Sequence, residues 1–182
     1  NTIILGAGTT ERIRVDSSGN VGINTTTPNT TLTVNGSISA TGDANINGNV
    51  FLINRPAFRV YGNGGTPIST PGVLSGTNWT LDYQQGTALN NTTGIFTAPL
   101  SGLYHITLNA RASNTNAGQL VCEKNASGTF LLFWEVAANS TVAHFGVSTI
   151  AKLAVGDTLR LKVVVGSIQF DGNDSWSVAF IG

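Results

Sequence analysis

VDSSGNVGINTTTP (residues 15–28), followed closely by LTVNGSI (residues 32–38), places short apolar runs between turns rich in Gly and Asn. The same unit, a β-branched residue, a turn of Asn or Asp with Gly, and a second β-branched residue, recurs along the chain. It is found at Val15–Val21, Val34–Ile38 and Ile46–Val50. Because Asn and Gly tolerate positive φ, these units predict very short strands joined by tight turns. Such strands cannot bury a core within one chain, so we expect them to stack on neighbours or wind around identical chains.

Residues 11–38 also resemble a known class of protein. The string ERIRVDSSGNVGINTTTP, followed by LTVNGSI, is similar to the shaft repeats of bacteriophage tail fibres and related virion spikes. The resemblance implies a trimeric attachment protein, whereas the periodicity by itself implies only a stacked or intertwined β element. We therefore predict a fibre shaft over residues 1–54 and a separate domain over residues 55–182.

The composition excludes several classes of function. The chain has 182 residues, enough for one ordinary domain plus an extension. Only 10% of the residues are charged and the formal net charge is zero, so the basic surface of a nucleic-acid-binding protein is missing. No apolar run approaches the length of a membrane span, so we predict no membrane insertion. Because the chain starts at Asn1 and contains no Met, we expect a fragment or a processed product.

Longer alternating strands are predicted after Arg55, and no helix is predicted. The stretches 95–108, 158–165 and 175–181 each alternate apolar and polar residues with a period of two, as in half-buried antiparallel strands. Turn signals recur about every 8–12 residues, which is typical of a β-sandwich or jelly roll. The fold class is thus all-β. The predicted core includes Phe96, Tyr104, Leu161 and Phe180, with Leu159, Val163 and Val165 on the inner face of 158–165.

The stretch FLLFW, residues 130–134, differs because it is apolar on both faces. A strand of this kind must be covered on both sides, and in a sandwich the second cover is often another subunit. The sequence therefore predicts a trimer interface at Phe130, Leu132 and Trp134.

Residues 55–182 resemble the globular head of the complement-type collagen-associated proteins, whose jelly roll is shared with tumour necrosis factor. Several residues support this resemblance: the opening Arg55-Pro56-Ala57-Phe58, the spaced set Leu89, Phe96, Gly102 and Tyr104, the pieces Lys124-Asn125 and Leu153–Asp157, and the closing strand Trp176–Ile181. The chain departs from the pattern where Ile106 and Leu108 replace aromatic residues and Gln84 replaces Asn or Asp. In that family the head is a tight trimer, so the resemblance implies a jelly-roll head and a homotrimer.

Nothing in the sequence nominates a catalytic site, so we predict that the protein is not an enzyme. His105 and His144 lie in strand-like alternation, and no activating motif surrounds either of them or the single cysteine, Cys122. Cys122 is predicted to be a buried free thiol. A depolymerase remains a third class of function, and it would need two carboxylates facing each other across a groove. No cofactor is predicted.

The candidate binding residues lie in polar loops of the predicted head. Loops on a rigid β scaffold are suited to recognition, and the most polar segments are Gly62–Thr66, Ser113–Gly118 and Asp171–Asp174. We predict receptor contacts at Asn114, Asn116, Asp171, Asn173 and Asp174, whose amides and carboxylates suit sugar hydroxyls. Asp171–Asp174 also has the oxygen ligands that calcium prefers. An ordinary hairpin turn is the favoured interpretation of that segment, and calcium binding is the alternative.

These observations together predict a homotrimeric fibre or spike on the virion surface. Its C-terminal head would bind a host-cell receptor, with glycans as one candidate class, and multivalent contacts would raise the avidity. The alternative is an extracellular complement-head-like recognition or coat module that does not come from a virus. Collagen-like Gly-x-y triplets would support that alternative, and the chain contains none.

Overall fold

The computed structural model describes residues 1–182 apart from 49–53, 65–67, 70, 112–116, 137–143 and 169. Within the described residues every regular element is a strand, and no helix is long and apolar enough to cross a membrane. The all-β prediction is therefore confirmed. The chain divides into two compact units, Asn1–Val50 and Phe51–Gly182, which we call the N-terminal unit and the C-terminal unit.

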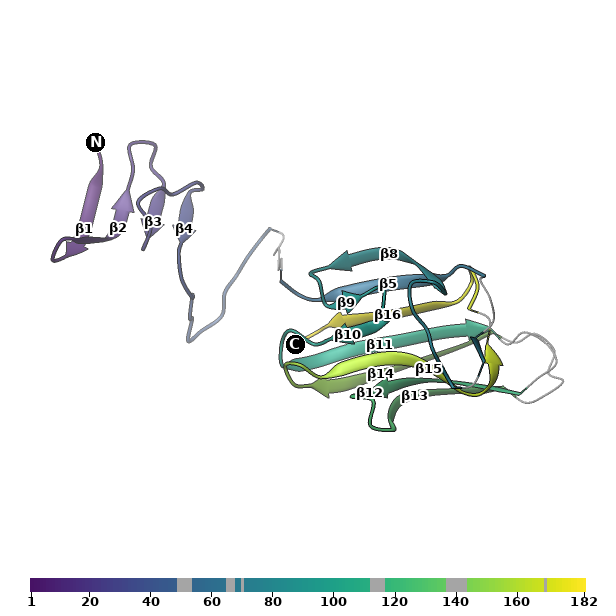
Figure 1. Ribbon diagram of the computed structural model, residues 1–182. Helices are drawn as coiled ribbons and strands as arrows, with labels where there is room; N and C mark the ends of the chain where they lie inside the picture. Colours follow the sequence, from purple (N-terminus) through teal and green to yellow (C-terminus); the bar gives the residue numbers. More distant parts are fainter. Residues whose placement is uncertain (49–53, 65–67, 70, 112–116, 137–143, 169) are drawn as a thin grey trace. The chain divides into compact units, whose positions relative to one another are not determined.

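The N-terminal unit contains a four-stranded sheet among its described residues (Figure 1). Its strands are β1 (Ile3–Ala7), β2 (Thr10–Val15), β3 (Val21–Ile23) and β4 (Leu32–Val34), paired in chain order. The first three strands are antiparallel, and β4 runs parallel to β3. Two of these strands have three residues each, as the repeat units predicted.

Side-chain hydrogen bonds and one glycine explain the tight reversal of the chain between β2 and β3. The Asp16 carboxylate accepts hydrogen bonds from the backbone N–H groups of Ser18, at 2.8 Å, and Asn20, at 2.9 Å. Gly19 has a φ of 86°, a conformation that residues with a Cβ rarely adopt. The segment DSSGN is thus a turn held by its own side chains, as expected for Asp and Asn at such positions.

The C-terminal unit is a sandwich of two antiparallel sheets (Figure 1). In the described part of the unit, one sheet has the order β14-β11-β16-β5-β8, and the other has the order β13-β12-β15-β10-β9, with β6 and β7 also pairing with β15. The strands are β5 (Ala57–Gly62), β6 (Ile68–Ser69), β7 (Gly72–Val73), β8 (Trp79–Gln85), β9 (Leu89–Asn90), β10 (Ile95–Thr97), β11 (Gly102–Arg111), β12 (Gly118–Lys124), β13 (Thr129–Val136), β14 (His144–Leu153), β15 (Thr158–Ile168) and β16 (Ser175–Phe180). Strands that are neighbours in a sheet are mostly distant in sequence, which is typical of a jelly roll.

The core of the C-terminal unit lies between the two sheets and is rich in aromatic rings. Phe58 packs edge-on against Trp176, at 4.7 Å between ring centroids, and lies 5.6 Å from Phe96 of the opposite sheet. Phe96 in turn contacts Tyr104 at 5.7 Å. Of the predicted core residues, Phe96, Tyr104 and Leu161 are fully buried, and Phe180 is partly buried against the core. This prediction is confirmed.

Two predictions of strand register are corrected. The predicted stretch 95–108 forms two strands, β10 and β11, which lie in different sheets because the chain turns at residues 98–101. Val165 was predicted to face inward but is 41% exposed. The pairing of β12 with β15 shifts between Gln119 and Leu120, so the residues beyond Val163 no longer keep the inward alternation.

The prediction for FLLFW was also wrong in part. Leu132 and Trp134, predicted at a trimer interface, are 5% and 2% exposed and belong to the core of their own chain. Phe130 and Phe133 are 43% and 47% exposed on the opposite face of β13. A register shift opposite Leu131 brings Phe130 onto the same face as Phe133. The interior of the same chain therefore covers one face, and of the three predicted interface residues Phe130 alone stays a candidate for contact with another subunit.

Candidate functional site

The strands that flank the predicted recognition loops have their described ends at one end of the sandwich. Strands β5, β11 and β15 end there, and β12 and β16 begin there (Figure 1). The pairing confirms it, because Ser175 at the start of β16 lies opposite both Tyr61 and Asn109. We call this the loop end and define it by the described residues 62–64, 75–78 and 170–174. The residues of the opposite end are 54–56, 86–88, 98–101, 125–128 and 154–157.

Two of the three predicted loops are bonded to each other at the loop end. The Gly62 N–H donates to the Asp174 carbonyl oxygen at 3.1 Å, and the Gly64 N–H donates to the Phe170 carbonyl oxygen at 3.1 Å. A Cβ at Gly62 would lie 2.2 Å from the Asp171 carbonyl oxygen, so only glycine permits this close approach. The Asn63 N–H also donates to the Asn78 carbonyl oxygen at 3.2 Å. The loop end is therefore a connected platform rather than a set of independent turns.

The predicted site residues differ in their exposure. Asp174 is fully buried, and its Oδ2 accepts the Asp171 N–H at 2.8 Å. Asp174 therefore holds the turn together, and the prediction that it contacts a receptor was wrong. Asp171 is half-buried and accepts the Asn173 N–H at 3.1 Å, whereas Asn173 is exposed. Asn114 and Asn116 lie outside the described residues, so their role stays a prediction.

The predicted alternatives of calcium binding and catalysis gain no support from the described residues. No three His, Cys, Asp or Glu side chains among them are grouped closely enough to hold a metal ion. The hydrogen bonds within Asp171–Asp174 are those of a hairpin turn. Cys122 is buried, as predicted, and burial raises the pKa of its thiol to about 12. This cysteine is therefore a protonated thiol at neutral pH and not a nucleophile.

Comparison with known proteins identifies the fold of the C-terminal unit. No protein-family model and no curated protein matches the chain. Among solved structures, the globular domain of zebrafish complement 1qA protein is 16% identical with a TM-score of 0.58, covering 71% of this chain and 98% of that chain. Eiger TNF from S. frugiperda is 14% identical with a TM-score of 0.57, covering 70% and 93%. Murine APRIL at pH 5.0 is 12% identical with a TM-score of 0.56, covering 70% and 100%.

The fold is the C1q and tumour necrosis factor jelly roll. The predicted fold class is thereby confirmed, because all-β composition, two packed sheets and these neighbours agree. At such low identity the likeness shows the fold alone.

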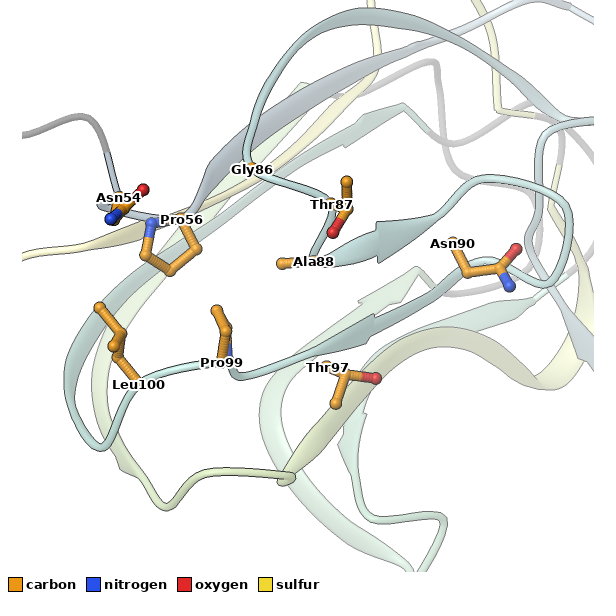
Figure 2. A pocket seen from close by; sticks show the side chains of 9 residues that line it. All are labelled: Asn54, Pro56, Gly86, Thr87, Ala88, Asn90, Thr97, Pro99 and Leu100. Atoms are coloured by element: carbon orange, nitrogen blue, oxygen red, sulfur yellow. The ribbon is translucent and has the colours of Figure 1, made fainter.

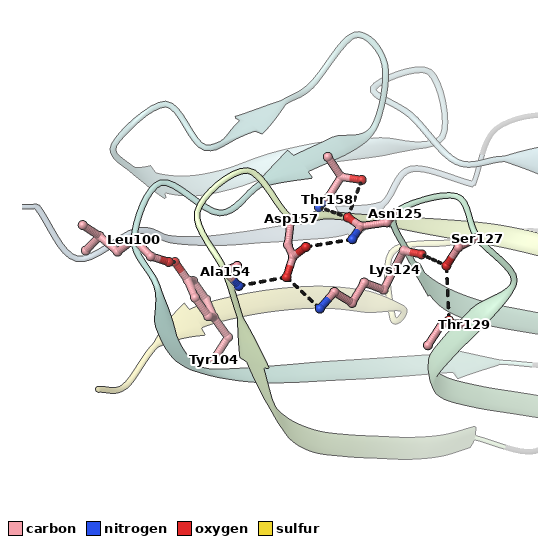
Figure 3. Close-up of polar contacts among 9 residues, drawn as sticks. All are labelled: Leu100, Tyr104, Lys124, Asn125, Ser127, Thr129, Ala154, Asp157 and Thr158. Atoms are coloured by element: carbon pink, nitrogen blue, oxygen red, sulfur yellow. Dashed lines mark hydrogen bonds and ion pairs between the residues drawn. The ribbon is translucent and has the colours of Figure 1, made fainter.

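The end of the jelly roll opposite the loop end is held by a polar cluster that joins two turns (Figure 3). Asp157, in the turn after β14, accepts hydrogen bonds from Asn125 Nδ2 at 2.7 Å and from the Ala154 N–H at 2.8 Å. Lys124 Nζ lies 2.7 Å from the same carboxylate, and Asn125 Oδ1 accepts the Thr158 N–H at 2.7 Å. The resemblance to the complement-type heads had pointed to Lys124-Asn125 and Leu153–Asp157, and the structure brings them together as a structural clasp.

This clasp predicts a loss of stability in acid. The hydrogen bond from Asn125, the contact with Lys124 and the Ala154 N–H lower the pKa of Asp157 to about 2 from its ordinary value of 3.8. Because the folded-state pKa is the lower one, the stabilisation is complete above about pH 4 and disappears as the pH falls towards 2. Asp157→Asn should lower the free energy of unfolding at pH 7 by about 1 kcal/mol and flatten its decline below pH 4. Urea unfolding at several pH values tests this, and parallel pH profiles for both proteins would contradict it.

The opposite end also contains a solvent-open cavity of about 580 Å³ (Figure 2). It is lined by Asn54, Pro56, Gly86, Thr87, Ala88, Asn90, Thr97, Pro99 and Leu100. None of these side chains ionises near neutral pH, so the lining offers no acid or base to activate the hydroxyls of Thr87 and Thr97. No sequence pattern predicted this cavity, because its walls come from three separate segments and consist of ordinary turn residues.

Proposed function

We propose that this chain is part of a homotrimeric virion fibre, with the N-terminal unit as shaft and the jelly-roll unit as a head that binds a host-cell receptor. The observation that supports it most strongly is the bare apolar face of the N-terminal sheet. Among the described residues 1–48, Gly22 alone is buried. A sheet with no core of its own needs a partner. The resemblance of its sequence to fibre shafts favours further copies of the same chain as that partner.

The strand register shows how continuous this apolar face is. Ile3, Val15, Val21 and Leu32 lie opposite one another across the four strands. Leu5, Ile13, Ile23 and Val34 form a second row on the same face. The intervening row, Ile4, Arg14, Gly22 and Thr33, points to the other face. Eight aliphatic side chains thus share one face, and Ile3, Leu5 and Leu32 are each more than half exposed in the single chain.

Copies of the same chain are the simplest cover for this face. Three identical sheets that turn their apolar faces towards a common axis would bury all eight side chains of each copy and leave the Arg14 face in water. The C-terminal unit supports three copies rather than two, because the jelly-roll family that it resembles forms tight trimers.

The role of the head would be binding and not catalysis. The described residues offer no nucleophile with an activating base, while the loop end presents exposed polar groups, including Asn63 and Asn173, on a rigid scaffold. Three loop ends in one trimer would raise the avidity for a receptor whose single-site affinity is weak. A surface glycan fits the amide and carboxylate groups of these loops.

The second candidate is an extracellular recognition module that does not come from a virus. It is favoured by the three solved structures named above, which are proteins of zebrafish, mouse and S. frugiperda. Adsorption of the purified chain to bacterial cells would support the fibre, and binding confined to animal cells or matrix would support this alternative.

Substitutions in the predicted recognition loops test the binding role. Replacing Asn114, Asn116 and Asn173 together with Ala should weaken binding of the labelled protein to host cells about tenfold, which corresponds to roughly 1.4 kcal/mol. The melting temperature should be unchanged, because these side chains are predicted to face solvent. Thr87→Ala, at the opposite end, is the control and should leave binding intact. Unaltered adsorption of the triple variant would place the receptor site elsewhere on the head.

A further inference from the structure

The N-terminal sheet ends at β4, whose outer edge has no partner strand among the described residues. Strands β3 and β4 pair in parallel, with Val21, Gly22 and Ile23 opposite Leu32, Thr33 and Val34. The residues that follow them are also paired. Asn24 Nδ2 donates to the Asn35 carbonyl oxygen at 3.0 Å, and Asn35 Nδ2 donates to the Asn24 carbonyl oxygen at 3.2 Å. Each rung of this stack therefore consists of three strand residues and an Asn.

The sequence contains a third rung that the single chain does not form. Ala44-Asn45-Ile46-Asn47 has the pattern of Leu32-Thr33-Val34-Asn35, and both are followed by Gly. Placed beside β4 in the same register, Ala44 would extend the row that ends at Leu32, and Ile46 would extend the row that ends at Val34. Asn47 would lie next to Asn35. In the structure residues 44–47 belong to no strand, and Ile46 is 59% exposed.

Within one chain, residues 36–43 cannot bring Ala44–Asn47 to the outer edge of β4 by a crossover like the one that connects β3 to β4. That first connection passes directly over Gly22, where a Cβ would lie 2.8 Å from the Thr25 carbonyl oxygen and 3.5 Å from Pro28 Cβ. The residue at the same place in β4 is Thr33, which has a side chain. Its Oγ1 already accepts the N–H groups of Asn29, at 3.1 Å, and Thr30, at 3.3 Å. The Thr33 side chain and the residues bonded to it therefore fill the space over β4 that a second crossover of this kind would need.

We infer that in the trimer Ala44–Asn47 of one copy pairs in parallel with the outer edge of β4 of a neighbouring copy. The inference rests on the proposed trimer and specifies how its chains interlock. Each chain would pass from one face of the shaft to the next over residues 36–43. The exchange closes the exposed edge of β4, covers Leu32 and Ile46, and continues the stack of Asn side chains. Main-chain hydrogen bonds, and not only apolar packing, then hold the three copies together.

A pair of cysteines tests this register. Thr33 and Asn45 would lie opposite each other, so oxidation of Thr33→Cys/Asn45→Cys should link each copy to the next. A non-reducing denaturing gel should then show mainly covalent trimers. In the control pair, Thr33→Cys/Ala44→Cys, the two side chains lie on opposite faces and should link poorly. Cys122 remains in every variant because it is buried. If the Thr33 substitution prevents folding, Leu32→Cys/Ala44→Cys tests the same register on the apolar face.

The outcomes separate this inference from the proposed function. Covalent trimers support the exchange. A disulfide within single chains would mean that the third rung belongs to the same copy, and free thiols would mean that no such rung forms; either result overturns the inference. Native mass spectrometry of the unoxidised wild-type protein tests the trimer independently, so a trimer without cross-links contradicts the exchange alone.

Discussion

Replacing Ile13 with Asp should dissociate the proposed trimer. Ile13 lies in the middle of the apolar face, opposite Leu5 on one side and Ile23 on the other. It is 37% exposed in the single chain and would be covered in the assembly. A carboxylate buried there without a partner costs roughly 2 kcal/mol or more per copy, and three copies together would weaken assembly by a factor on the order of 10⁴. Mass photometry over a dilution series measures the change.

The same sheet offers a matched control. Ile4 is 52% exposed, but it points to the face that bears Arg14. Ile4→Asp should therefore leave the trimer intact, although it introduces the same charge at the same residue type. Limited proteolysis should cleave residues 1–48 faster in Ile13→Asp than in Ile4→Asp. Equal effects of the two substitutions would mean that the apolar face is not the interface.

Phe96→Ala should destabilise the jelly roll by about 3–5 kcal/mol. The ring is fully buried between the two sheets, and it contacts Phe58 and Tyr104 at centroid distances of 5.6 and 5.7 Å. Its removal would leave a cavity that the rigid aromatic neighbours cannot fill. Chemical denaturation followed by tryptophan fluorescence measures the loss, since Trp176 packs against Phe58 in the same cluster.

Phe133→Ala is the control for this experiment. Phe133 is 47% exposed on the outer face of its sheet, so its truncation should cost less than half as much. If Phe96→Ala and Phe133→Ala lowered the stability equally, the ring of Phe96 would not lie in the core described above.

The core of the jelly roll was predictable from the sequence because alternation with a period of two reports directly which face of a strand is buried. Phe96, Tyr104 and Leu161 follow that rule. The rule fails where a strand slips by one residue. The register shifts beside Leu131 and near Val165 arise from the pairing of β13 and β15 with β12. No local sequence feature marks these shifts.

The candidate site was predictable as a set of loops but not residue by residue. Polar, Gly-rich segments indicated the loops, and the structure joins two of them, Gly62–Gly64 and Asp171–Asp174, at one end. The burial of Asp174 was not predictable, because it depends on the Gly62 loop, which is more than a hundred residues away in the sequence. The parallel pairing of β3 with β4 was not predicted either. Its one sign in the sequence is the Asn that follows each strand, Asn24 and Asn35, and these two residues are hydrogen-bonded to each other.

The most direct test of the account is the mass of the particle that the wild-type chain forms in dilute buffer. One chain has a mass of 18.9 kDa. Because the described residues 1–48 leave the apolar face of the N-terminal sheet uncovered, light scattering coupled to size exclusion should report about three times that mass, independent of concentration over the micromolar range. A well-folded particle with the mass of a single chain would contradict the account.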